Sequence, residues 1–133
     1  MNRIVFSVIL LFASGISSAQ VLSPAKWSWK ASATSVKVGD EIDLIFNVTV
    51  DDNWYVYAND FDPDCGPLLT TITLNDHPGF KTVGSFRAIK SKDKHDEIFG
   101  CDVKLFVGKG EFRQRIKVLS PDLKISGVIE GQT

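Results

Sequence analysis

This sequence of 133 residues has few cysteines, few histidines and almost no net charge. It contains two cysteines and two histidines, and its formal net charge is −1. His77 and His95 have no cysteine or histidine at the spacing of a zinc site, so no metal is expected. There is no basic patch with interleaved aromatic residues, which argues against nucleic acid as a partner. No phosphate-binding glycine loop is present either, and we expect no organic cofactor.

Long hydrophobic runs are absent except near the start of the chain. Arg3 precedes an apolar run over residues 4–13, and Ser17, Ser18 and Ala19 then provide a small-residue cleavage site. This order is typical of a secretory signal peptide. A run this short cannot cross about 30 Å of hydrocarbon as a helix. We therefore predict a cleaved signal peptide over residues 1–19 and one exported domain over residues 20–133.

A helical period is also missing, and apolar residues instead recur at every second position. Such alternation predicts half-buried strands. We expect clear strands over residues 27–29, 42–50, 54–57, 101–107 and 112–118, and weaker ones over 71–74, 80–86 and 123–129. About seven short strands with polar turns in one domain favour an all-β fold, an immunoglobulin-like antiparallel β-sandwich. Arg113, Arg115 and Lys117 alternate with apolar residues and predict a solvated strand face.

One segment combines residue types that a simple turn does not need: Asp96, Glu97, Ile98, Phe99 and Gly100. Isoleucine and phenylalanine lose free energy when they face water. The segment makes sense as a loop if its aromatic residue covers a reactive group while the two carboxylates set the local potential. The alternative is a strand-entry turn in which Ile98 and Phe99 belong to the core.

This loop resembles the cap loop in the family of N-terminal periplasmic domains of the thiol:disulfide interchange protein DsbD. Residues 53–57 and 125–133 also resemble segments of that family, and the resemblance extends from about residue 25 to residue 133. It implies an immunoglobulin-like redox module that performs thiol–disulfide exchange without a cofactor. Its electrons would come from transmembrane and thioredoxin-like parts of the full-length inner-membrane protein. They would go to periplasmic disulfide isomerases or to thiol proteins of cytochrome c maturation.

The resemblance also implies roles for individual residues around the cap loop. Phe99 would be the lid over a redox cysteine, and Gly100 would allow the bend. Asp96 and Glu97 would keep the thiol protonated, because a nearby negative charge raises a thiol pKa. Two upstream tyrosines, Tyr55 and Tyr57, match residues that line the redox site. Alternatively, both are strand tyrosines selected for sheet packing.

The redox cysteines of the family would follow Thr133, beyond the sequence given, so the resemblance implies a chain truncated before its nucleophile. Cys65 and Cys101 do not match those positions. They are interpreted as a structural disulfide, as two separate thiols or as a relocated redox pair. An even count in an oxidising compartment favours a bridge. The wide spacing lacks the local Cys-X-X-Cys constraint that tunes reactivity, which argues against the relocated pair.

Two other functions remain as alternatives. One is a non-catalytic immunoglobulin-like binding or adaptor domain without the redox pair, because one fold supports many functions. The other is calcium binding by Asp60, Asp62 and Asp64, but the glycine and glutamate of an EF-hand loop are missing. A turn fixed by Pro63 is the favoured interpretation of that segment.

Overall fold

The computed structural model describes residues 23–133, and the predicted signal peptide over residues 1–19 lies outside this part of the chain. Within it, the regular elements are strands and one 3-10 turn, which confirms the all-β prediction. In chain order they are β1 (Ala25–Ala31), β2 (Glu41–Val50), β3 (Tyr55–Tyr57), η1 (Pro63–Cys65), β4 (Thr71–Leu74), β5 (Phe80–Ile89), β6 (Lys92–Asp96), β7 (Cys101–Val107), β8 (Lys109–Val118) and β9 (Gly127–Glu130).

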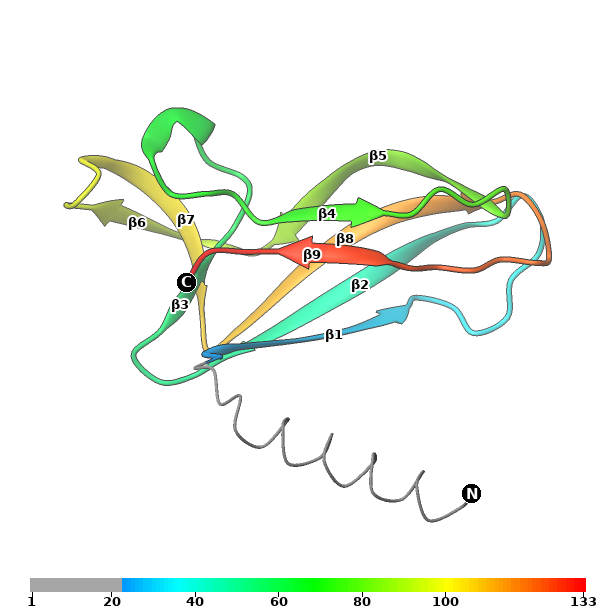
Figure 1. Ribbon diagram of the computed structural model, residues 1–133, viewed down its shortest axis with the longest axis horizontal. Coiled ribbons are helices and arrows are strands. Elements are labelled where there is room, and N and C mark those ends of the chain that lie inside the picture. The colour runs from blue at the N-terminus through cyan, green and yellow to red at the C-terminus, as the bar shows by residue number, and fades with distance from the viewer. Residues whose placement is uncertain (1–22) are drawn as a thin grey trace, which may run out of the picture.

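The longest strands build one antiparallel sheet in the order β1-β2-β8-β5. Because strand side chains alternate between faces, the period-two sequence of β2 directs Leu44, Phe46 and Val48 to one side. The register places Phe46 opposite Phe112 of β8, so the apolar faces of the two central strands coincide. In Figure 1 these strands run along the horizontal long axis of the molecule, and the β6–β7 hairpin lies beyond them on the left.

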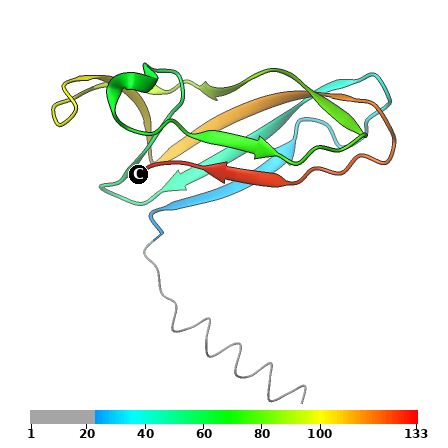
Figure 2. The ribbon, with the colours of Figure 1, turned by 45° about the horizontal axis from the view of Figure 1, so that its top comes forward.

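The second layer consists of two smaller antiparallel sheets, β3-β7-β6 and β4-β9. Figures 1 and 2 show β4 and β9 lying over the large sheet, with the β6–β7 hairpin at one end. Backbone hydrogen bonds join the small sheets, from the Thr70 amide to the Ala58 carbonyl (3.1 Å) and from the Tyr57 amide to the Gln132 carbonyl (3.0 Å). The two layers form the predicted antiparallel sandwich.

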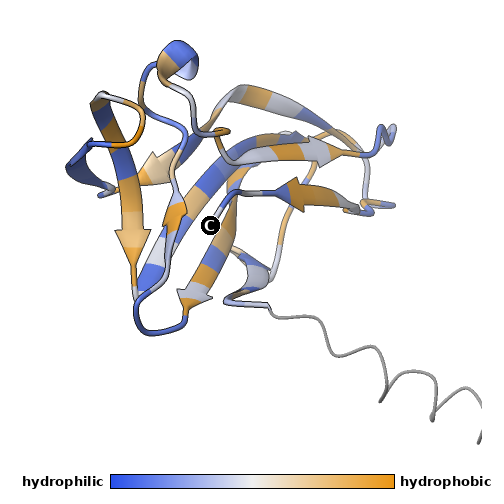
Figure 3. Ribbon diagram, turned by 60° about the vertical axis from the view of Figure 1, so that its left-hand side comes forward, coloured by the Kyte–Doolittle hydropathy of each residue, from blue (hydrophilic) through white to orange (hydrophobic). Residues whose placement is uncertain are grey.

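The core lies between the layers and is centred on Phe112, which is fully buried. Its ring stacks on Phe86 at 5.1 Å between centroids, meets Phe106 edge-on at 5.2 Å and lies 5.7 Å from Trp27. Aromatic pairs at these separations contribute beyond their buried area. Figure 3 shows apolar and polar positions alternating along the strands that enclose this core.

The large sheet differs from the prediction on its outer face. Asp43 alternates with the core residues of β2, yet only 6% of it is exposed. Its carboxylate accepts hydrogen bonds from Arg115 (3.1 Å), Arg87 (3.2 Å) and Arg113 (3.3 Å). The prediction of a solvated basic face was therefore incomplete, because Arg113 and Arg115 on that face bind a buried carboxylate. Burial alone would raise the pKa of Asp43, but the arginine hydrogen bonds outweigh it and the pKa lies below its ordinary value.

The described part of the chain contains no helix of the length and hydropathy that crossing a bilayer requires.

Candidate functional site

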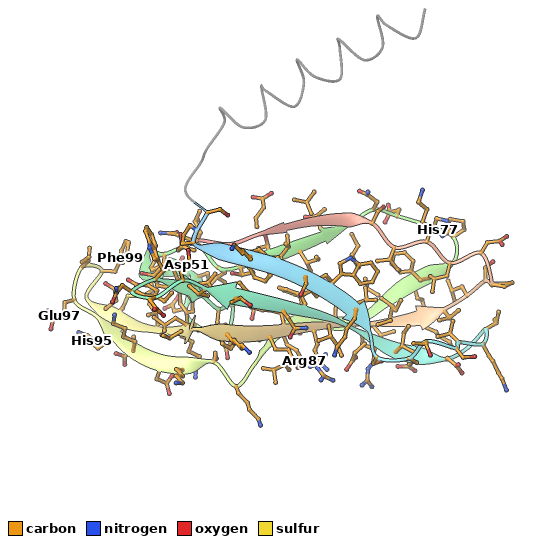
Figure 4. The ribbon with its side chains drawn as sticks, turned by 90° about the horizontal axis from the view of Figure 1, so that it is seen from below. Asp51, His77, Arg87, His95, Glu97 and Phe99 are labelled. Atoms are coloured by element: carbon orange, nitrogen blue, oxygen red, sulfur yellow. A yellow bond between two sulfur atoms is a disulfide. The ribbon has the colours of Figure 1, made fainter. Side chains whose placement is uncertain are left out.

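The segment predicted as a cap loop is the turn of the β6–β7 hairpin. The last strand pair of this hairpin is Asp96 with Cys101, and residues 97–100 form the loop between them. The Gly100 amide donates to the Asp96 carbonyl (2.7 Å), and Gly100 adopts a φ of +70°, which other residues enter at a cost. Figure 4 shows Glu97, Phe99 and His95 at one end of the molecule, with His77 at the opposite end. We keep the name cap loop for residues 96–100.

Asp96 organises the cap loop from within. One carboxylate oxygen accepts hydrogen bonds from the Ile98 amide (2.9 Å) and the Phe99 amide (3.1 Å). The other oxygen accepts from the hydroxyl of Tyr57 (3.1 Å). The bond from the Phe99 amide is the main reason that the pKa of Asp96 lies below its ordinary value, and Tyr57 and the Ile98 amide lower it further against the effect of burial. Asp96 is therefore a carboxylate that fixes the loop.

The two tyrosines named from the sequence lie directly behind this carboxylate. The hydroxyl groups of Tyr55 and Tyr57 are 3.4 Å apart, and their rings meet edge-on with centroids 5.3 Å apart. The ammonium group of Lys94 lies 4.7 Å from the centre of the Tyr55 ring, a cation–π geometry. Burial, followed by the hydrogen bonds to Tyr55 and Asp96, raises the pKa of Tyr57. Tyr57 therefore keeps its proton and donates a hydrogen bond to Asp96.

The two cap carboxylates are not equivalent. Glu97 is exposed, and within the described residues its carboxylate forms no hydrogen bond or ion pair. Two residues before Glu97, the exposed side chain of His95 pairs with Asp102 (2.8 Å). Only Glu97 of the two cap carboxylates is therefore free to influence a group that approaches from outside.

The apolar residues of the cap loop lie outside both core clusters. Ile98 is 88% exposed and Phe99 is 43% exposed. The alternative that both belong to the core is therefore wrong. The Phe99 ring instead lies against the backbone of Gly66, where an added Cβ would collide with it. Gly66 also has a φ of +132°, so both its lack of a side chain and its conformation require glycine. Phe99 thus covers the backbone beside Cys65.

Cys65 and Cys101 form a disulfide, with their Cα atoms 6.0 Å apart. The bridge joins the last residue of η1 to the first residue of β7, immediately after the cap loop. The interpretation as two separate thiols does not describe this structure. Closing a loop with a sequence separation of 36 stabilises the folded state by about 4 kcal/mol in the chain-entropy model.

The acidic segment before Cys65 forms a capped turn. Asp62 is the N-cap of η1, and its side chain accepts a hydrogen bond from the Asp64 amide (2.9 Å). Asp60 instead accepts one from the Ser91 hydroxyl (2.7 Å). The bond to Asp62 is the local backbone contact that the turn interpretation expects, whereas Asp60 accepts from a residue distant in sequence. No cluster of three or more potential metal ligands occurs among residues 23–133.

Sequence reasoning missed two residues of this site, Gln132 and Gly66. The backbone carbonyl of Gln132 accepts a hydrogen bond from the Tyr57 amide (3.0 Å), and its side-chain oxygen accepts one from the Leu68 amide (2.6 Å). The end of the chain is thereby held beside the segment that carries the disulfide. The sequence offered only weak signals, since a glycine before Pro67 indicates no more than a turn. A glutamine near the chain end carries no signal for such a contact.

Comparison with known proteins gives one match. The model of the family described as "Thiol:disulfide interchange protein DsbD, N-terminal" matches residues 19–132. Neither the curated proteins nor the solved structures gave a match to the chain.

Proposed function

Since the chain belongs to the family of the N-terminal domain of the thiol:disulfide interchange protein DsbD, we propose that it is a periplasmic module for thiol–disulfide exchange. It would receive reducing equivalents from thioredoxin-like domains by way of a transmembrane domain of the same protein. It would pass them to oxidised disulfide isomerases or to thiol proteins of cytochrome c maturation. Its redox cysteines would follow Thr133, so that the chain described here supplies the scaffold and the cap.

The observation that carries this proposal is the position of Gln132 relative to the cap loop. The side chain of Gln132 accepts a hydrogen bond from the Leu68 amide. Leu68 lies two residues after Gly66, which Phe99 covers. Consecutive Cα atoms are about 3.8 Å apart. Cysteines within a few residues of Thr133 would therefore begin beside the surface that the cap loop shelters. This arrangement supports a lid function for Phe99.

The proposed exchange needs only sulfur chemistry. A thiolate of the reduced module attacks one sulfur of the partner's disulfide, and a mixed disulfide forms while the partner's second sulfur leaves as a thiolate. The second cysteine of the module then attacks the mixed disulfide. The module ends oxidised and the partner ends as a dithiol, with two electrons transferred. No metal or organic cofactor enters either step.

The cap loop would control when the thiolate is available. The aromatic ring of Phe99 would exclude other thiols and desolvate the nucleophile, which raises a thiol pKa. The charge of Asp96 is already committed to two amides and Tyr57. Glu97 is thus the cap carboxylate that would repel a second negative charge.

The test is to read the gene past codon 133 and to measure exchange by the protein extended through that region. We expect two cysteines and reduction of an oxidised disulfide isomerase. Replacing Phe99 with alanine should speed the reaction with a small aromatic disulfide at least tenfold. The matched variant Ile98→Ala, which alters an exposed neighbour, should not. An extension without cysteines, or one that exchanges with no partner, would contradict the proposal.

Residues 1–19 are proposed as the export signal of this module. An n-region with Arg3, an apolar run and the sequence Ser17-Ser18-Ala19 support it. Amino-terminal sequencing of protein recovered from the periplasm should begin at Gln20. Retention of Met1 on the exported protein would refute cleavage.

The competing function is a non-catalytic adaptor domain. It is favoured by one observation, that the two cysteines of this sequence are bonded to each other. The same extended protein decides between the two functions. An adaptor binds its partner equally well after every thiol has been alkylated, whereas an exchange module loses the reaction.

A further inference from the structure

The cap loop is fixed at both of its ends, but by different kinds of bond. At its first residue, Asp96 holds the loop through hydrogen bonds from Tyr57 and from the loop's own amides. At its far end, Gly100 is followed directly by Cys101, which is covalently bonded to Cys65. The first attachment can break and reform within the native state. The second requires a chemical reaction.

The covalent attachment lies beside the contact that closes the cap. Cys65 precedes Gly66, and Phe99 precedes Cys101 by two residues. The two short segments therefore meet twice, once through the disulfide and once through the Phe99 ring on the Gly66 backbone. Phe99 is 43% exposed and belongs to neither core cluster, so packing in the core does not hold its ring in place. Its position depends on the distance between the two segments, and the disulfide fixes that distance.

We propose that the Cys65–Cys101 disulfide is a latch that keeps the cap loop closed. While it is intact, the cap loop stays beside the segment around η1, and the Phe99 ring stays on the Gly66 backbone. Its reduction lets the segment around η1 separate from the start of β7, and Phe99 then leaves Gly66. The inference that this latch controls the exchange site rests on the proposed function. The coupling between the disulfide and the loop is a property of the described residues alone.

The chemistry that opens the latch is reduction by a dithiol. A thiolate of the dithiol attacks one of the two sulfurs, the other leaves as a thiolate and takes up a proton, and the second thiol of the reductant resolves the mixed disulfide. Two cysteine thiols form as the reductant becomes a disulfide. Cys65 and Cys101 are both half-buried, so a reductant reaches their sulfurs less easily than those of a fully exposed disulfide. The latch should therefore react more slowly than an exposed disulfide.

Amide hydrogen exchange tests the latch without any partner protein. The amides of Ile98, Phe99 and Gly100 each donate to Asp96, so their exchange reports cap opening. In the oxidised protein they should be protected. Reduction with dithiothreitol, or the double substitution Cys65→Ala with Cys101→Ala, should speed their exchange at least tenfold. Amides between β2 and β8 should keep their protection, which shows that the fold persists.

Reduction with dithiothreitol and the double cysteine substitution serve as controls for each other. Dithiothreitol should have no further effect on the double variant, because that variant has no latch to reduce. If the double variant fails to fold, stepwise reduction of the folded wild-type protein still gives the result. Unchanged protection of the three cap amides after complete reduction would overturn the latch. That outcome would leave the proposed exchange function intact, whereas failure of partner reduction with fast cap exchange would contradict the function alone.

Discussion

Two buried aspartates hold two different regions of this molecule. Asp43 lies on the outer face of the large sheet and Asp96 at the root of the cap loop, and each is 6% exposed. Each has a pKa below its ordinary value. The donors differ. Asp43 accepts from three arginine side chains on β5 and β8, whereas Asp96 accepts from two amides of its own loop and one tyrosine hydroxyl.

This difference separates global from local stabilisation. The partners of Asp43 are far away in sequence, so their bonds form only when three strands of the large sheet are in register. Two of the bonds to Asp96 come from residues two and three positions later, so they can break while the sandwich stays folded. Elements that open in function are drawn from the less stable parts of a protein. The following predictions test this contrast, from the largest expected effect to the smallest.

Replacing Asp43 with alanine should reduce the free energy of unfolding by about 3 kcal/mol, since it removes the carboxylate that three arginines share, and among the described residues only Arg113 keeps another one, that of Glu111. The measurement is urea denaturation followed by tryptophan fluorescence. The matched control is Asp52→Asn, an exposed aspartate, which should change stability by less than about 0.5 kcal/mol. An effect of Asp43→Ala no larger than that of the control would remove the distinction between the two aspartates.

Replacing Asp96 with alanine should lower the free energy of unfolding less than Asp43→Ala does, because it removes a charged acceptor whose amide donors belong to its own loop. Most of the effect should be local. We expect at least tenfold faster exchange of the Ile98 and Phe99 amides, with unchanged protection in β2 and β8. Equal loss of protection in the cap loop and in the large sheet would show that Asp96 supports the whole sandwich. That result would contradict the contrast between Asp43 and Asp96.

Acid should weaken both regions. A carboxyl whose pKa is lower in the folded state stabilises that state above the unfolded pKa of about 3.9, and this stability is lost as the pH falls through the folded pKa. The free energy of unfolding should therefore decrease below about pH 4. In the double variant Asp43→Asn with Asp96→Asn the decrease should be shallower. Parallel curves for the variant and the wild-type protein would mean that other carboxylates dominate.

Tyr57 should resist deprotonation. The sequence has two tyrosines, so in the variant Tyr55→Phe any tyrosinate absorbance at 295 nm comes from Tyr57 alone. Free tyrosine is half ionised near pH 10. We expect no such absorbance at pH 10 as long as circular dichroism shows a folded protein, because burial and the bond to Asp96 persist in this variant. Ionisation at the ordinary pH would show that the hydroxyl is not held against Asp96.

The strands could be predicted where one face is apolar. The alternation in residues 42–50 and 101–107 gave β2 and β7 nearly to their ends. In contrast, β6 has the sequence Lys-Asp-Lys-His-Asp and no apolar face, so its pairing with β7 could not be seen. That strand makes the cap loop a hairpin turn. The loop itself was identified by its residue types and by family resemblance.

The contacts of the site depend on tertiary structure and could not be predicted. The register that sets Asp43 opposite Arg115 follows from strand order, which period-two patterns do not specify. The same holds for the contact between Phe99 and Gly66, whose positions are 33 apart in sequence. Cys65 and Cys101 could be paired only as one of three interpretations, because bridging depends on distances that a sequence does not contain.

The contact between Phe99 and Gly66 has a consequence for how this site can vary among related chains. Position 99 is constrained once, by the space above the neighbouring backbone. Position 66 is constrained twice, by that space and by a backbone conformation that disfavours any side chain. A smaller residue at position 99 would therefore be tolerated beside glycine, but it would not rescue a larger residue at position 66. In a suppressor screen, no substitution at position 99 should therefore restore a variant in which Gly66 has been replaced.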